Sequence, residues 1–398
     1  MRVLTVNTGS SSVKAGLFDM HDGERLVLSA LGERIGAADA RLELRDAAGK
    51  VLRQQQGDIA DHAAALRQLF NWLQELGPET ALEAIGHRVV HGGARFVQPT
   101  RVSVDVLAQL RKLTAIDPDH LPQAIAGMQI ALEAYPPLPQ VACFDTAFHR
   151  DKPRVATLYA LPHDALDSGI VRYGFHGLSY EYVLGRLRAE APAAANGRLI
   201  IAHLGSGASM AAVRDGVSID TTMGFSPTGG LMMGTRSGDI DPGVLLYLLR
   251  ERGLSADGLS ELVNARAGLL GVSGTSADLR DLLAREGSDA RAADAVGLFC
   301  YQARKFLGAL AAVLGGLDSL VFTGGIGEHA APIRSRICAG LEFLGLQIDE
   351  RRNAEHAPII SAEHSRVMVR VIPTDEALMI ARHTYRLLTE TGASDVQL

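Results

Sequence analysis

Small hydrogen-bonding residues follow the first run of strand-forming residues in this chain. Residues 3–19 read VLTVNTGSSSVKAGLFD, and the apolar run breaks at Asn7 into a threonine, a glycine and three serines. Without bulky side chains, the backbone N–H groups and hydroxyls of such a turn can approach phosphate oxygens and donate to them. A tight hairpin turn has the same composition, so this loop alone leaves a phosphate site and a plain turn open.

Further glycine-rich stretches extend the pattern along the chain. They read HLGSGAS at 203–209, GFSPTGGLMMGTRSGDIDPG at 224–243 and FTGGIGE at 322–328. Several such loops in one protein suggest several phosphates, so we favour the phosphate interpretation for the set. The P-loop patterns GxxxxGKS and GxxxxGKT do not occur. Residues 325–330 fit GxGxxA with Asp349 about twenty residues later, which leaves a nicotinamide enzyme as a weak alternative.

Two arginines are conspicuous by their surroundings. Arg236 lies inside the glycine-rich run 224–243, and Arg88 lies in GHRVVHGG, at a strand that is otherwise apolar. Most of the other arginines are expected at the surface. His87 and His91 stand four residues apart in the second motif, but a zinc protease would need glutamate after the first histidine, where Arg88 stands. We therefore reject a zinc site there.

An aspartate and a histidine complete the chemistry-bearing residues. Asp145 ends the apolar stretch VACF, and a carboxylate at the end of a strand can bind a metal or orient a nucleophile. It can equally be a helix N-cap. His176, in RYGFHGLSY, is either a core histidine or a donor to phosphate.

Two strand–turn–strand units would position the first of these residues. Residues 199–216 read LIIAHLGSGASMAAVRDG and match the N-terminal stretch at a constant offset, so that Asn7 corresponds to His203 and Gly9 to Gly205. Two strands joined by a small-residue turn are typical of a β-hairpin. The shared polar residue at the strand end favours an internal duplication, and hence two similar domains, over a chance match.

The segments between these units predict helices. Residues 66–76 and 106–113 carry apolar residues at helical spacing and end before Gly-Pro and Asp-Pro pairs. Residues 320–327 predict a strand and a glycine-rich turn before a helix around 333–344. The alternation of strands and helices is typical of an α/β protein.

Near the C-terminus, VIPTDEALMIAR predicts a strand followed by a long helix. We expect Thr374 to be its N-cap, with Asp375 and Glu376 in its first turn, where negative charge is favourable.

Length and composition restrict the class of protein. A chain of 398 residues exceeds the size of one hydrophobic core, so two domains are expected. The net charge of −6 argues against a nucleic-acid partner, and no basic or long apolar run suggests a membrane. The three cysteines are far apart, and the N-terminus does not resemble a signal peptide. We therefore expect a cytoplasmic protein with small-molecule partners.

Taken together, the motifs resemble the acetate kinase family of the actin-like ATPase superfamily, which also includes sugar kinases and Hsp70-type chaperones. The resemblance runs in family order over nearly the whole chain, through NTGSSSVK, GHRVVHGG, FDTAFH, RYGFHG, HLGSGAS, MGTRSGDIDPG, GVSGTSADLR, FTGGIGE and VIPTDEALMIAR. It implies an α/β fold of duplicated actin-like, or ribonuclease H-like, domains flanking a nucleotide cleft. The expected domains are residues 1–149 with 378–398, and residues 150–377.

The resemblance also implies a reaction. The terminal phosphoryl group of ATP would pass directly to acetate, giving acetyl phosphate, with Mg²⁺ or Mn²⁺ as cofactor. Arg88 and Arg236 would clamp the carboxylate and the phosphoryl group, and His176 would hydrogen-bond the phosphoryl group in the transition state. The family is typically homodimeric.

The remaining site residues are assigned by the same resemblance. Residues implied to hold the metal are Asn7, Asp145 and Glu376, with Asp145 also counted as catalytic. Residues implied to contact the carboxylate are Arg88, Val90, Asp119, His120, Phe175 and Pro227. Residues implied to bind ATP are Ser10, Ser12, Lys14, His203, Gly205, Ser206, Gly207, Asp278, Arg280, Gly324, Gly325, Ile326 and Gly327.

Departures from the family pattern cluster near the substrate. The family's APLHNP reads DPDHLP at 117–122, so Asp119 replaces a leucine that would line the acetate pocket, and Leu121 replaces an asparagine. FTPLEG reads FSPTGG at 225–230, which changes Thr228 and Gly229, and Ser206 stands where an asparagine would reach a phosphate.

The sequence leaves alternatives to acetate kinase activity open. One methylene is worth only about 1–3 kcal/mol of discrimination, so propionate remains an alternative, and Asp119 facing the substrate would favour a longer or hydroxylated acid. A non-catalytic ATP-driven clamp is the alternative of another class. The joint presence of Arg88, His176 and Arg236 argues against that clamp.

Overall fold

The computed structural model describes residues 1–9, 11–21 and 23–392, and the chain divides into two compact units. Unit 1 comprises residues 1–147 and the segment that begins at Asp375, and unit 2 comprises Phe148–Thr374. We expected the chain to cross between domains at 149–150 and 377–378, a few residues from these positions. In the described part of the chain, no helix is both long and apolar enough to cross a bilayer.

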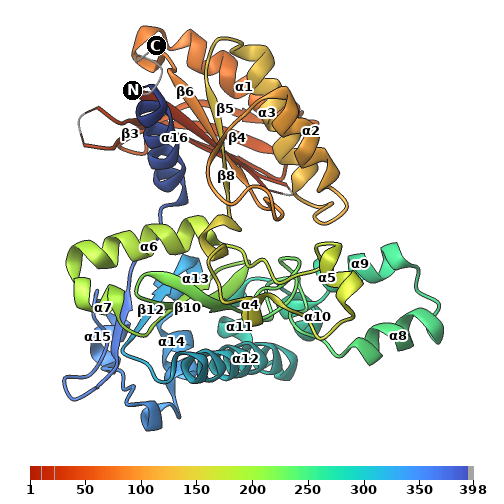
Figure 1. Cartoon of the computed structure of the whole chain (residues 1–398), viewed down its shortest axis with the longest axis vertical. Helices are drawn as coiled ribbons and strands as arrows, with labels where there is room; N and C mark the ends of the chain where they lie inside the picture. Colours follow the sequence, from red (N-terminus) through yellow and green to blue (C-terminus); the bar gives the residue numbers. More distant parts are fainter. Residues whose placement is uncertain (10, 22, 393–398) are drawn as a thin grey trace. The chain divides into compact units, whose positions relative to one another are not determined.

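Unit 1 is built on an eight-stranded mixed sheet (Figure 1). Its strands lie in the order β5-β4-β3-β2-β1-β6-β8-β7. β1 pairs antiparallel with β2 and parallel with β6, which pairs parallel with β8. The strands are β1 (Arg2–Thr8), β2 (Val13–Asp19), β3 (Arg25–Glu33), β4 (Arg41–Asp46), β5 (Val51–Gln56), β6 (Ala84–Val89), β7 (Thr100–Arg101) and β8 (Gln140–Phe144).

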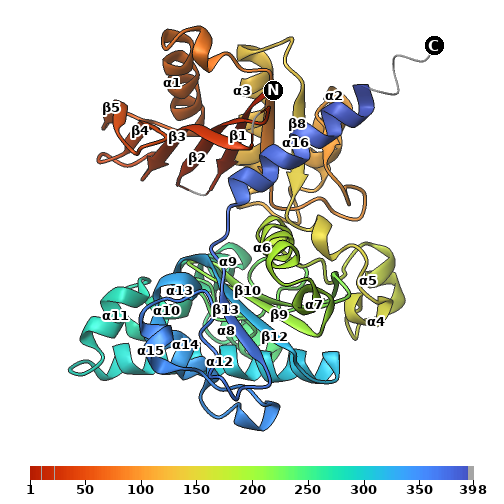
Figure 2. The same cartoon turned by 90° about the vertical axis from the view of Figure 1, so that its left-hand side faces the viewer.

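Helices cover both faces of this sheet because side chains alternate along its strands. Leu4 and Val6 of β1 pack in one core with Leu66, whereas Val3 packs in another with Ala381. Figure 2 shows α16 crossing one face, with α1 and α3 on the other. The helices of unit 1 are α1 (His62–Glu75), η1 (Pro78–Thr80), α2 (Val104–Lys112), α3 (Leu121–Ala134) and α16 (Glu376–Gly392).

Unit 2 contains a five-stranded sheet in the order β11-β10-β9-β12-β13. The strands are β9 (Leu199–Leu204), β10 (Ala208–Arg214), β11 (Val217–Thr221), β12 (Ser319–Thr323) and β13 (Met368–Val371). The helices are η2 (Ala147–His149), which spans the crossing from unit 1, α4 (Arg154–Thr157), α5 (His163–Asp167), α6 (Gly177–Glu190), α7 (Pro192–Asn196), α8 (Pro242–Arg250), α9 (Ala256–Ala265), α10 (Gly268–Ser273), α11 (Leu279–Arg285), α12 (Ala290–Leu314), α13 (Gly324–His329), α14 (Ala331–Cys338), η3 (Glu342–Leu344) and α15 (Glu350–Ala354).

The two sheets share one strand order. β3-β2-β1-β6-β8 in unit 1 and β11-β10-β9-β12-β13 in unit 2 each combine three antiparallel strands with two further parallel ones. Asn7 pairs with Lys14 in the first hairpin, and His203 pairs with Ser209 at the corresponding position of the second. The expected duplicated, actin-like arrangement of the α/β fold is thereby confirmed.

Two local predictions were wrong. Residues 324–327 were expected to form a turn, but they begin α13, because Gly324, with a φ of 75°, lets the chain pass from β12 directly into the helix. The cap of α16 is Asp375, not Thr374, since the Asp375 Oδ1 atom accepts from the Leu378 N–H at 2.8 Å.

Candidate active site

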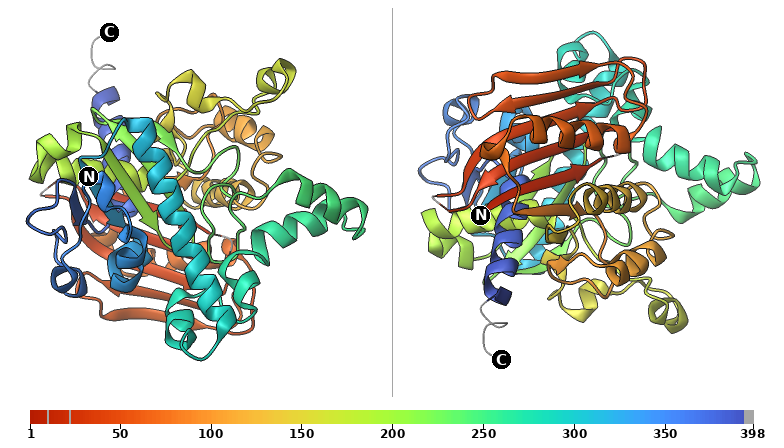
Figure 3. Two further views of the ribbon diagram at one scale, coloured as in Figure 1. Left: turned by 90° about the horizontal axis from the view of Figure 1, so that it is seen from below. Right: turned by 90° about the horizontal axis from the view of Figure 1, so that it is seen from above.

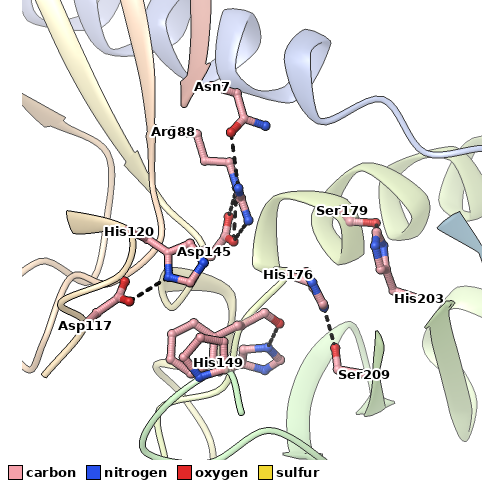
Figure 4. Close-up of polar contacts among 12 residues, drawn as sticks. Asn7, Arg88, Asp117, His120, Asp145, His149, His176, Ser179, His203 and Ser209 are labelled. Atoms are coloured by element: carbon pink, nitrogen blue, oxygen red, sulfur yellow. Dashed lines mark hydrogen bonds and ion pairs between the residues drawn. The ribbon is translucent and has the colours of Figure 1, made fainter. Parts of the chain in front are cut away.

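Three polar side chains of unit 1 form a hydrogen-bonded cluster (Figure 4). Arg88 donates from Nε to both carboxylate oxygens of Asp145, at 3.1 and 3.2 Å, and from Nη2 to Oδ2 at 2.6 Å. Its Nη1 donates to the Asn7 Oδ1 atom at 3.2 Å. The side chain of Asp145 is 1 % exposed and that of Arg88 17 %, so water weakens this ion pair little.

The cluster forms because β1, β6 and β8 are parallel neighbours. Asn7 and Arg88 are the second-last residues of β1 and β6, and Asp145 is the first residue after β8. The carboxyl ends of parallel strands meet at one edge of a sheet, which is where α/β proteins bind ligands. Residues far apart in the sequence thereby reach one place.

Neighbouring carboxylates stabilise the charged form of Arg88. Burial alone would lower its pKa, but Asp145, Glu376 and Asp117 outweigh burial and raise that pKa above its ordinary value. Arg88 is therefore a permanent cation that can bind an anion. Each of the three predicted metal ligands, Asn7, Asp145 and Glu376, interacts with this one guanidinium.

The turn between β1 and β2 carries the predicted phosphate-binding serines. The Gly9 N–H donates to the Ser12 carbonyl at 2.8 Å, and a Cβ atom on Gly9 would lie 2.7 Å from the Ser12 Oγ. His62 Nε2 lies 2.7 Å from the Gly9 carbonyl oxygen and holds the turn. Lys14 is exposed on β2, and the predicted ligand Ser10 lies outside the described residues.

The 117–122 segment buries one aspartate and exposes another. Asp119 is exposed, whereas Asp117 is 3 % exposed and its Oδ1 lies 2.7 Å from His120 Nδ1. The Asp117 Oδ2 atom is buried without a hydrogen-bond partner. Leu121 is fully buried in an apolar cluster with residues of α2 and β8. This packing explains why an apolar residue stands where the family has asparagine. Val90, directly after β6, is also buried.

Two histidine rings are stacked in unit 2 (Figure 4). The ring centroids of His176 and His203 are 4.3 Å apart and the rings are 21° from parallel. His176 Nδ1 lies 2.8 Å from the Ser209 Oγ, and His203 Nδ1 lies 2.8 Å from the Ser179 Oγ. Each serine thus fixes the orientation of one ring.

His176 has a strained backbone. With φ at 60° and ψ at 23°, it adopts the left-handed conformation directly before α6, and the preceding Phe175 is fully buried. This conformation costs a residue other than glycine about 1–3 kcal/mol, and such residues cluster at functional sites. The strain supports a role for His176 beyond packing.

Arg236 lies beside the His176 ring. A Cβ atom on Gly207 would be 2.9 Å from the Arg236 Nη2 and 3.2 Å from the His176 Nε2, so a glycine there lets both groups approach the loop. The Arg236 Nη1 donates to the Pro227 carbonyl at 2.7 Å, and the Gly205 N–H donates to the Gly207 carbonyl at 3.0 Å. Two of the predicted glycine-rich loops therefore meet at His176.

The start of α13 lies at the end of β9. A Cβ atom on Gly324 would lie 2.7 Å from the Leu204 carbonyl oxygen. The Gly324 N–H donates to the Glu328 Oε1 at 2.8 Å, which also accepts from the Thr374 N–H at 3.2 Å. Of the other predicted ATP ligands there, Gly325 is exposed, Ile326 half-buried and Gly327 buried.

Asp278 and Arg280 lie at the start of α11. The Asp278 Oδ1 accepts from the Arg280 N–H at 2.8 Å, and the guanidinium of Arg280 donates to both carboxylate oxygens, which lowers the pKa of Asp278. The Arg280 side chain is 89 % exposed. The link to the 203–209 stretch is indirect, since the Gly234 N–H donates to the Ser206 carbonyl and a Cβ atom on Gly234 would lie 3.3 Å from the Ala277 carbonyl oxygen.

The donors in unit 1 fit a hard cation. Asn7, Asp145 and Glu376 offer amide and carboxylate oxygens, which Mg²⁺ prefers, and Mg²⁺ is commonly held by one or two carboxylates together with substrate phosphates. Among the described residues, no group of three or more His, Cys, Asp or Glu side chains could hold a metal.

Sequence reasoning missed the partners that orient these groups. They are Asp117, Ser179, Ser209 and Glu328. Asp117 carried a signal, since it precedes His120 by three residues. Ser209 carried another, because it is a polar residue in an apolar strand opposite His203. Nothing local marked Ser179 or Glu328.

The duplicated fold places the chain among the proteins with the actin-like ATPase fold. Within that class, the profile of the acetokinase family matches residues 2–382. The chain belongs to this family.

Individual relatives agree over nearly their full lengths. The chain is 46 % identical to the acetate kinase of Methylocella silvestris, with 98 % of this chain and 99 % of the relative covered. It is also 46 % identical to that of Streptomyces avermitilis, with 97 % of each covered. Among solved structures, Porphyromonas gingivalis acetate kinase has a TM-score of 0.88 at 38 % identity, and a Francisella tularensis propionate kinase 0.91 at 36 %, each covering 97 % of this chain and 99 % of the other.

Proposed function

We propose that the chain catalyses the reversible transfer of the terminal phosphoryl group of ATP to acetate, giving acetyl phosphate and ADP. The observation that carries the proposal is the Arg88–Asp145–Asn7 cluster, a shielded guanidinium held beside oxygen ligands at the strand ends of a family member. Direct in-line transfer needs positioning and charge neutralisation rather than a covalent intermediate.

Each unit would contribute groups of its own to the reaction. In unit 1, Arg88 would bind the carboxylate, with Val90 and His120 beside it and Asp145 orienting it. In unit 2, Arg236 would neutralise the transferring phosphoryl group and His176 would hydrogen-bond it. A Cβ atom on Gly207 would lie 2.9 Å from the Arg236 Nη2 and 3.2 Å from the His176 Nε2, and this proximity supports their acting together.

ATP would be held mainly by residues of unit 2. His203, Gly205 and the start of α13 converge at the end of β9, which supports a role in binding its phosphates. Asn7, Asp145 and Glu376 would hold Mg²⁺ or Mn²⁺, and the ion would offset the negative charge of the phosphates. The side chains of Asp278 and Arg280 would also contact ATP.

Acetate is the substrate we place first. Asp119 is exposed, so its carboxylate does not lie in the core of unit 1. We therefore see no reason to replace acetate by a longer or hydroxylated acid. Propionate remains the runner-up, because one methylene changes the discrimination by only about 1–3 kcal/mol and a structural relative is titled a propionate kinase.

The test is an assay of the purified protein with MgATP and acetate, propionate, butyrate, glycolate or lactate, trapping acyl phosphate with hydroxylamine. We expect acetate to give the highest kcat/KM, with propionate next. A preference for a hydroxylated acid would move the substrate while keeping the reaction. No product with any acid would favour an ATP-driven clamp. Asp119→Leu is the matched control, and it should leave the order of substrates unchanged.

We also propose that the protein is a homodimer. Neither α8 nor α9 has a buried residue, and Figure 3 shows both helices projecting from unit 2. α8 exposes Val244, Leu246, Tyr247 and Leu249, and a helix that is apolar on several sides is normally covered. A second copy is the cover that the family resemblance implies.

The three free, buried cysteines are compatible with a reducing compartment, and we propose the cytoplasm.

A further inference from the structure

Two side chains without a role in the proposed reaction hold the segment that leads to His176. Lys152 is 6 % exposed, and its Nζ donates to the carbonyl oxygens of Arg172 at 3.0 Å and Tyr173 at 2.8 Å. His149 Nε2 lies 3.1 Å from the Phe175 carbonyl oxygen (Figure 4). Three carbonyls in residues 172–175 are thus held by groups that lie three residues apart in the sequence.

The His149 contact does not change with pH. Burial, with a smaller effect of the Lys152 charge, lowers the pKa of His149 to about 3. The ring is therefore neutral under any assay condition near neutrality. The Phe175 carbonyl can only accept, so the His149 Nε2–H donates to it. Nδ1 is then an acceptor, and the Ser218 hydroxyl, whose Oγ lies 2.8 Å away, donates to it.

Lys152 differs because its charge can change at ordinary pH. Burial first, and then the neighbouring Arg172 cation, lower the pKa of the Lys152 amine to about 8, against the opposing effect of Asp220. Arg172, Asp220 and His149 are the charged or titratable groups that act on or contact this amine. A charged donor makes hydrogen bonds about twice as strong as a neutral one, so loss of the proton weakens both contacts.

The held segment ends in the strained residue. Gly174 has a φ of 86°, and a Cβ atom there would lie 2.5 Å from the Thr221 Cγ2 and 2.7 Å from the His149 Cδ2. His176 follows in the left-handed conformation. Such a conformation persists only where its surroundings over-determine it, and the contacts of Lys152 and His149 are part of those surroundings.

We propose that Lys152 is a positioning residue, whose protonated amine holds the carbonyls of Arg172 and Tyr173 and thereby keeps His176 in the conformation that acts on the phosphoryl group. This inference rests on the proposed function, because its readout is acyl phosphate formation. It gives the enzyme an alkaline limit that arises from loop geometry rather than from unfolding.

The test compares pH profiles of kcat and KM from about pH 6.5 to about pH 10, which spans the titration of this amine. The wild-type kcat should fall several-fold with a midpoint near pH 8, while the KM for acetate stays unchanged. Lys152→Arg, which stays charged, should show no such fall. Lys152→Met should have a kcat about tenfold below the wild-type value at pH 6.5 and no alkaline fall, because two part-buried carbonyls lose their donor at every pH. Lys305→Met, which removes an exposed lysine on α12, should follow the wild type.

Thermal unfolding separates positioning from a purely structural role. The folded amine titrates near pH 8 and an unfolded lysine near 10.5, so the folded protein releases this proton first. Between those values the unfolded state binds more protons, and the contribution of Lys152 to the free energy of unfolding rises with pH. The wild type should therefore gain in Tm relative to Lys152→Arg over the range in which its kcat falls.

Parallel kcat profiles for the wild type and Lys152→Arg would overturn the inference. A fall in wild-type kcat that is accompanied by a loss of Tm relative to Lys152→Arg would overturn it as well. In both cases the proposed function would stand. Failure of the wild type to form acyl phosphate at pH 7 would overturn both proposals.

Discussion

At the scale of single residues, the serines that hydrogen-bond the stacked histidines determine the orientation of the two rings. Ser209 contacts both His176 Nδ1 and the Tyr180 hydroxyl, and Ser179 contacts only His203 of the two rings. We predict that Ser209→Ala lowers kcat by about tenfold with little change in the KM for acetate, since a buried ring nitrogen loses its partner. Ser179→Ala is the matched variant, and it should raise the KM for ATP instead. Steady-state kinetics of both variants checks this.

The same effect on the same parameter in both variants would contradict separate roles for the two histidines. A circular dichroism spectrum and a Tm close to those of the wild type would show that each variant is folded, which makes the comparison of kcat and KM meaningful.

Residues at strand ends were predictable because the information is local. Asn7, Arg88 and Asp145 each interrupt or end an apolar run, and parallel pairing then brings them together. The contact between His176 and Ser209 depends on two elements and on side-chain rotamers, which periodicity does not encode. Exposure was also not predictable: the sequence left open whether Asp119 faces the substrate or the solvent, and it did not mark Asp117 as the buried carboxylate.

At the scale of elements, the packing of α16 on β6 depends on one glycine. A Cβ atom on Gly86 would lie 2.4 Å from the Thr384 Oγ1 and 2.6 Å from the Ile380 Cγ2. Gly86→Ala should therefore destabilise the protein by about 1–3 kcal/mol in urea unfolding. The matched control is Gly297→Ala in α12, where the new Cβ would meet no described atom within 4 Å apart from its chain neighbours and the adjacent backbone of its own helix, and it should stabilise by up to about 1 kcal/mol. Equal effects of the two changes would contradict this packing.

Helices with long periodic patterns were predictable, and short polar transitions were not. α1 and α2 lie close to the predicted ranges because leucine spacing and the caps Asp61 and Ser103 agree. α13 was missed because glycine composition favours a turn, whereas one left-handed glycine suffices to start a helix there. The cap of α16 was misassigned by one residue because Thr374 and Asp375 are both good caps in sequence.

At the scale of the whole molecule, α8 and α9 have no buried residue, and α8 exposes several large apolar side chains. We predict that Leu246→Asp combined with Tyr247→Asp converts a dimer into a folded monomer, because both side chains are about half exposed on α8. Light scattering after size exclusion measures this. Val155→Asp, at an exposed valine of α4, should stay dimeric. A monomeric wild type, or a dimeric double variant, would contradict the proposed dimer.

The duplication was readable in the sequence because both hairpins keep a polar residue at the same strand position. Asn7 and His203 are the second-last residues of equivalent strands, and the two strand orders agree.

The measurement that tests the central claim most directly is the rate of acyl phosphate formation from MgATP and acetate at pH 7, for the wild type, Arg88→Ala and Arg236→Ala. We predict acyl phosphate with the wild type and a kcat lower by at least about a hundredfold in each variant, because a preorganised charge in a shielded site is worth about 3 kcal/mol. A near-normal kcat in both variants, or no acyl phosphate from the wild type, would contradict the account.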